Sequence, residues 1–108
     1  MSYVGIHPTG RRFYVESKTG RPLVFAVFAR DVRKPVVQWA RVEVVEDRPY
    51  KDELHRVDGC YVAYQGDMPP RVKAEESARW YREVIGHHEA VVVELRPADG
   101  NGRKESLP

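Results

Sequence analysis

The sequence predicts an α+β fold: a mainly antiparallel sheet built as a meander of hairpins, open or partly closed into a barrel, with one helix. Two observations predict it. Short runs rich in β-branched and aromatic residues alternate with turn-forming Gly, Pro and Asp. One later segment instead repeats its apolar residues with the helical period. A length of 108 residues suits one core, so we expect residues 1–96 to form a single domain. Residues 97–108, rich in Pro, Gly and charge, are expected to be a flexible tail.

The first half of the chain predicts four strands. Residues 3–6 form a short edge strand, and residues 12–16 alternate apolar and polar side chains, as a half-buried strand does. Residues 23–29 are apolar at both parities, which is typical of a central strand covered on both faces. Residues 36–46 are dense in β-branched residues, with Val42 and Val44 on one face.

The strand at 23–29 therefore needs two covers, and the predicted helix supplies one. The second cover could be the sheet curling into a barrel, the segment 47–58, or another copy of the protein. A partner over that face would make the chain a homo-oligomer or an interaction module.

Residues 47–59 predict a short helix or, nearly as well, a structured loop. Asp47 and Pro49 suit a helix start, and Tyr50, Leu54 and Val57 have helical spacing. Residues 60–65 then predict a further strand.

The clearest element is an amphipathic helix near residues 70–86. Two prolines precede it, Gly86 ends it, and a final strand follows at residues 90–96. Its apolar stripe is widened by Trp80 and Val84 and consists of Ala74, Ala78, Tyr81 and Ile85.

Composition excludes several function classes. With 18 basic and 16 acidic residues, the net charge of +2 provides no strong long-range field toward nucleic acid or membranes. No apolar run approaches the roughly 20 residues of a membrane span. The single cysteine excludes an internal disulfide, and we expect a cytoplasmic protein. The excess of Arg and Val fits either a thermophile or a G+C-rich genome.

Histidine and cysteine residues predict no metal site, cofactor or active site. His87 and His88 are weak metal candidates, because adjacent residues of an extended chain point to opposite sides and known zinc spacings are absent. Their position after the helix is explained by the favourable interaction of cationic or polar residues with the negative, C-terminal end of the helix dipole. Cys60 shares its parity with Val62 and Tyr64, so we predict a buried structural cysteine.

The outward parity of the strands places aromatic and basic residues together on the sheet. Such a face is typical of single-stranded nucleic-acid binders, which stack bases and neutralise phosphates. The balanced net charge argues against it, and cross-strand pairing is the structural alternative. The residues concerned are Arg12, Tyr14, Trp39, Arg41 and Tyr61.

The sequence thus favours a small non-enzymatic binding or assembly protein whose partner is itself or another protein. The alternative is a sequence-tolerant nucleic-acid-binding domain that uses the five residues above. A small metal-dependent or thiol enzyme ranks third.

Overall fold

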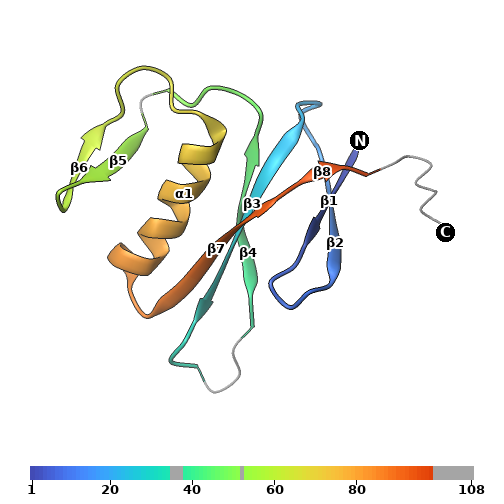
Figure 1. Ribbon diagram of the computed structural model, residues 1–108, viewed down its shortest axis with the longest axis horizontal. Coiled ribbons are helices and arrows are strands. Elements are labelled where there is room, and N and C mark those ends of the chain that lie inside the picture. Colours follow the sequence, from blue (N-terminus) through green and yellow to red (C-terminus); the bar gives the residue numbers. More distant parts are fainter. Residues whose placement is uncertain (35–37, 52, 99–108) are drawn as a thin grey trace.

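The computed structural model describes residues 1–34, 38–51 and 53–98. It confirms the α+β class: the sheets are antiparallel, there is one main helix, and the described residues form no closed barrel (Figure 1). The elements are β1 (Ser2–Ile6), β2 (Arg12–Glu16), β3 (Leu23–Asp31), β4 (Ala40–Glu46), β5 (Leu54–Val57), β6 (Cys60–Ala63), α1 (Pro70–Trp80), the π-helical turn η1 (Tyr81–Ile85), β7 (His88–Glu94) and β8 (Arg96–Pro97).

The strands form three sheets with the orders β4-β3-β7, β2-β1-β8 and β5-β6. β3 is the middle strand of the first sheet, as its doubly apolar sequence predicts. Figure 1 shows α1 on one side of β3 and the β1–β2 hairpin on the other. Two buried clusters therefore lie back to back across the central sheet.

The cluster beneath α1 is closed by small helical residues. Ala74 and Ala78 are buried, which lets the helix backbone approach the sheet closely, and Met68 fills the space beside them. The other members are Phe25, Val27, Ala29, Val45, Tyr50 and Ala90.

The second face of β3 is covered by the chain's own β2-β1-β8 sheet, which is none of the three predicted covers. This cluster consists of Tyr3, Val15, Leu23, Ala26, Phe28 and Leu95. β1 is the middle strand of the covering sheet rather than the predicted edge strand. β3 thus gives no reason of its own to expect a partner.

Two irregularities in the pairing of β3 with β4 correct the predicted faces. One register shift lies between Leu23 and Phe25, so Leu23 joins the β1 side and Val24 the helix side. A second shift leaves Val42 unpaired, which places Val42 and Val44 on opposite faces. A bulge adds one residue to one strand and reverses the alternation beyond it.

The helix matches the predicted range, but its stripe ends early. Pro70 occupies the first turn and Gly86 ends the helix with a φ of 78°. Ala74, Ala78 and Tyr81 contact the core, whereas Ile85 is 41% exposed. The wider π-helical winding of η1 changes the angular spacing after Tyr81 and turns Ile85 outward.

The described residues of the region 47–59 form no helix, and only those before Leu54 form the loop that the sequence predicts as the alternative. The region also contains β5, which pairs with β6 through a two-residue turn at Asp58 and Gly59, both with positive φ. Asp-Gly between short apolar runs is a strong hairpin signal. Cys60 lies on this hairpin and is exposed, so the prediction of a buried cysteine is wrong.

The last strand crosses from one sheet to the other at Leu95. β7 pairs with β3, the Leu95 N–H donates to the Val24 carbonyl at 2.9 Å, and β8 then pairs with β1. The predicted tail begins at Pro97, which lies within β8, and Ala98 still donates a hydrogen bond to Ser2. The rest of that tail, residues 99–108, lies outside the described residues, as do residues 36 and 37 of the strand predicted at 36–46.

Candidate functional site

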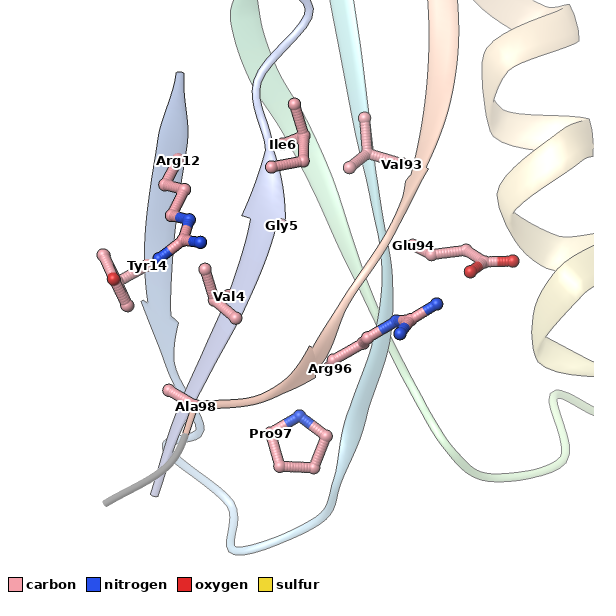
Figure 2. A pocket seen from close by; sticks show the side chains of 10 residues that line it. All are labelled: Val4, Gly5, Ile6, Arg12, Tyr14, Val93, Glu94, Arg96, Pro97 and Ala98. Carbon is pink, nitrogen blue, oxygen red and sulfur yellow. The ribbon is translucent and has the colours of Figure 1, made fainter. Parts of the chain in front are cut away.

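A wedge-shaped groove of about 630 Å³ opens where β7 diverges from β1 (Figure 2). Pairing between β1 and β8 ends at Val4 and Arg96, so Gly5 and Ile6 have no described strand on this side. Val4, Ile6 and Val93 give the groove its apolar lining. Side chains from the neighbouring strands, Arg12, Tyr14, Glu94 and Arg96, surround it.

The groove has a basic rim. Glu94 pairs with Arg71, 3.3 Å between Nη2 and Oε2, while Arg12 and Arg96 make no ion pair with a described residue. Residues 1–22, which include β1 and β2, carry four basic side chains and one acidic side chain, Glu16. A hydrogen bond from Ser2 and the charge of the N-terminal ammonium lower the pKa of Glu16.

Four of the five residues predicted to bind nucleic acid lie near one another. Arg12 and Tyr14 line the groove, Tyr14 and Arg41 line a neighbouring cavity of about 560 Å³, and Arg12 and Trp39 line a third. Tyr61 belongs to the separate β5–β6 sheet, beyond α1 (Figure 1).

These residues do not form the open sheet face that the sequence predicts. Trp39 is half-buried against the core on the β1 side, and the Arg30 guanidinium lies 4.7 Å from its ring centre. The Trp39 ring therefore already makes two contacts within the fold, one with the core and one with Arg30. Arg12, Tyr14 and Arg41 are exposed.

A second candidate site is the hairpin–helix surface, which we define as Leu54, Arg56, Tyr61 and Trp80. Leu54, Tyr61 and Trp80 are 56%, 36% and 42% exposed. Leu54 and Trp80 line one cavity of about 350 Å³, and the Arg56 guanidinium lies 5.9 Å from the Tyr61 ring centre. Large apolar side chains beside an arginine are typical of the contact points of protein interfaces.

Ion pairs fix the hairpin against the helix. Arg56 pairs with Glu83 at 3.2 Å, and Lys73 reaches Glu53 at 2.8 Å and Glu43 at 3.6 Å. Burial lowers the pKa of Lys73, but its hydrogen bond to Glu53 and the two carboxylate charges outweigh burial and raise it. The hairpin–helix surface is therefore held in a defined position.

His87 and His88 are not brought together with other metal ligands. His87 adopts a positive φ of 58° after the helix, and the His88 Nδ1 lies 2.8 Å from the Gly86 carbonyl. The described part of the chain contains no cluster of three His, Cys, Asp or Glu residues able to hold a metal ion.

Sequence reasoning missed the hairpin–helix surface because it placed Leu54 and Trp80 in apolar helix stripes. The Asp58–Gly59 turn could have revealed the hairpin, since it predicts a strand on each side. The exposure of Trp80 has no sequence signal, because it depends on where α1 meets the sheet.

Among the helices of the described ranges, none combines the length and the apolar character needed to cross a bilayer. Comparison with known proteins finds no family model, no curated protein and no solved structure that matches this chain.

Proposed function

We propose that this chain is a small non-enzymatic protein-binding or assembly module, and that the hairpin–helix surface is its contact surface. One observation carries the proposal: Leu54 and Trp80, from two different elements, expose their side chains around one cavity. Large apolar side chains that are exposed next to one another are typical of interaction sites.

The identities of the neighbouring residues support a protein partner. Tyr, Trp and Arg are enriched at the energetic centres of protein interfaces, where a partner excludes water from them. Arg56 and Tyr61 are already held by Glu83 and by each other, so little side-chain freedom remains to be lost on binding.

The test compares three forms of the purified chain: wild type, Trp80→Ala with Leu54→Ala, and Val32→Ala. Val32 is the matched control because it is also apolar and 48% exposed, but lies at the end of the β3–β4 hairpin. We expect self-association by light scattering, or capture of a defined partner, to be lost only in the Trp80/Leu54 variant. Equal behaviour of all three forms would contradict the proposal.

A cytoplasmic location belongs to the same proposal. Cys60 is the only cysteine in the sequence and is exposed as a free thiol, a state that reducing compartments preserve.

We propose nucleic-acid binding as the second candidate function, because Arg12 and Arg96 rim an apolar groove together with Tyr14. Arginines there would neutralise phosphates, and the exposed Tyr14 ring would stack on a base. Arg41 would extend the contact through the neighbouring cavity.

A labelled single-stranded oligonucleotide, titrated at two salt concentrations, tests this second function. Binding should weaken at the higher salt, and Arg12→Ala and Arg41→Ala should each weaken it further. Lys51→Ala, which removes an equal charge from the loop between β4 and β5, should leave binding unchanged. The idea fails if no binding occurs at low salt or if all three variants behave alike.

A further inference from the structure

The two edges of the β5–β6 hairpin differ in how their backbone groups are satisfied. On the β5 side, the Arg56 N–H donates to Glu76 Oε1 at 3.1 Å, and Arg79 Nη1 donates to the Arg56 carbonyl at 3.4 Å. Side chains of helix α1 therefore satisfy both backbone groups of Arg56 on this edge. On the β6 side, no described strand lies beyond β6.

The register identifies the backbone groups on the open edge. The Tyr64 N–H donates to the Glu53 carbonyl at 3.0 Å, and hydrogen-bonded pairs recur at every second residue of an antiparallel ladder. His55 with Val62 therefore forms the next such pair along the hairpin. Tyr61 and Ala63 consequently direct their N–H and C=O groups away from β5.

The open edge lacks the features that prevent strand association. Soluble proteins protect exposed edges with charged residues, proline or a covering element. β6 contains neither charge nor proline, and all four of its residues are exposed. Figure 1 shows β5 between β6 and α1, so the open edge of β6 faces away from the helix, and no described strand pairs with it.

We infer that β6 pairs antiparallel with β6 of a second copy of this chain, which joins two hairpins into a four-stranded sheet. This inference rests on the proposed function and names its partner. A second copy is the occupant that fits, because an uncharged edge meets no like-charge repulsion from itself. A charged foreign strand would find no complementary charge on β6.

The outward-facing groups fix the register. Pairing Tyr61 with Ala63 of the second copy, and Ala63 with its Tyr61, satisfies both outward residues of each strand. Val62 then lies opposite Val62 of the second copy on the two-fold axis, in the non-hydrogen-bonded position. The two Cys60 residues are offset by four residues, about 13 Å along the strands, which is too far for a disulfide.

The decisive comparison is Val62→Lys against Val57→Lys, measured by light scattering and sedimentation over a range of concentrations. Both valines are exposed and lie on the same hairpin face, but only Val62 lies on the predicted axis. We expect wild type and Val57→Lys to have twice the chain mass and Val62→Lys to have the chain mass. A monomeric wild type, or a dimeric Val62→Lys, overturns the inference.

Two further variants keep the test decisive if Val62→Lys fails to fold. Ala63→Pro removes only an outward N–H, so it leaves the pairing with β5 intact and should abolish dimerisation. In a Cys60→Ser background, Val62→Cys should form a disulfide-linked dimer on mild oxidation, whereas Ala63→Cys should not, because its partner lies two residues out of line. Linkage of both cysteine variants to equal extents overturns the register.

The outcomes also separate this inference from the proposed function. A chain that stays monomeric, yet loses a different partner through Trp80→Ala with Leu54→Ala, refutes β6 pairing and leaves the hairpin–helix surface intact. A dimer that is lost in Trp80→Ala with Leu54→Ala, but not in Val62→Lys, also refutes β6 pairing and leaves the hairpin–helix surface intact. A monomer without any partner refutes both.

Discussion

Gly5 of β1 lies close to the side chains of Phe13, from β2, and of Leu95, which connects β7 to β8. A Cβ atom at this position would lie 2.9 Å from Leu95 Cδ2 and 2.9 Å from Phe13 Cε1. Both neighbours pack in or against the core on the β1 side, so neither can move freely. Position 5 therefore requires glycine, because the side chains of Leu95 and Phe13 occupy the space that a Cβ atom would need.

Gly5→Ala should therefore lower the free energy of unfolding by about 1–3 kcal/mol, the usual cost of overpacking. Urea denaturation measures this loss. Ile6→Ala is the control, because Ile6 is the next residue of β1 and is 54% exposed, so its change should stay within about 0.5 kcal/mol. Equal stabilities of the two variants would contradict the packing described around Gly5.

Asp31 sets part of the response of this protein to acid. Its carboxylate accepts hydrogen bonds from the Arg33 guanidinium at 2.9 and 3.1 Å and from the Arg33 N–H at 3.0 Å, which hold its pKa well below the usual range. Because the pKa of Asp31 is lower in the folded state than in the unfolded chain, the ionised carboxylate stabilises the fold at every pH above the unfolded-state pKa, which is near 4. This stabilisation is lost as the pH falls below that value toward the folded-state pKa.

Asp31→Asn should therefore be less stable than wild type at pH 7, and the difference should shrink as the pH falls below about 4. Denaturation at pH 7 and pH 3 measures it, with Asp67→Asn as the control for an acid in another turn. A difference between Asp31→Asn and wild type that stays constant with pH would be inconsistent with this ion pair.

At the scale of the element, the β5–β6 hairpin depends on the helix beside it. A two-stranded hairpin is marginal alone, and Glu76 connects it to α1 by accepting from the Arg56 N–H and pairing with Arg79 at 3.2 Å. Loss of Glu76 leaves that N–H without its acceptor.

Glu76→Ala should therefore open the hairpin locally while the rest of the fold persists. Hydrogen exchange should accelerate at the Val57 and Val62 amides, and the exchange of β3 amides should be unchanged. Glu75→Ala removes the adjacent, exposed carboxylate and should have neither effect. Acceleration in β3 as well would mean that the hairpin is not a separate unit of stability.

An element could be predicted from the sequence where the residues that determine it lie within the element or directly beside it. β2 has the predicted bounds because alternation and turn residues are local, and α1 begins where Pro70 allows it. The bulge at Val42 and the π-helical turn after Tyr81 were not predictable, because both adjust the chain to partners distant in sequence. Tyr61 was assigned to the wrong sheet for the same reason: parity gives the face of a strand but not its neighbours.

At the scale of the whole molecule, β3 joins two clusters into one structure. Phe28 lies in the cluster on the β1 side and Met68 in the cluster beneath α1, and both are buried. Because the residues of β3 from Phe25 to Ala29 alternate between the two clusters, neither cluster can disassemble without exposing the strand between them.

Phe28→Ala and Met68→Ala should thus lower the free energy of unfolding by about 3–5 and about 2–5 kcal/mol, respectively, and each variant should still unfold in one transition. Far-UV circular dichroism and tryptophan fluorescence should give coincident curves for both variants, as a single cooperative domain requires. Two separate transitions in either variant would show that the predicted single domain consists of two.

Amide hydrogen exchange at two protein concentrations tests the pairing of two β6 edges most directly. The Tyr61 and Ala63 amides should be protected at high concentration and exchange rapidly at low concentration. The Arg56 amide, bonded to Glu76, should not change. Equal exchange of Tyr61 and Ala63 at both concentrations, with the chain at a single mass, would contradict the account.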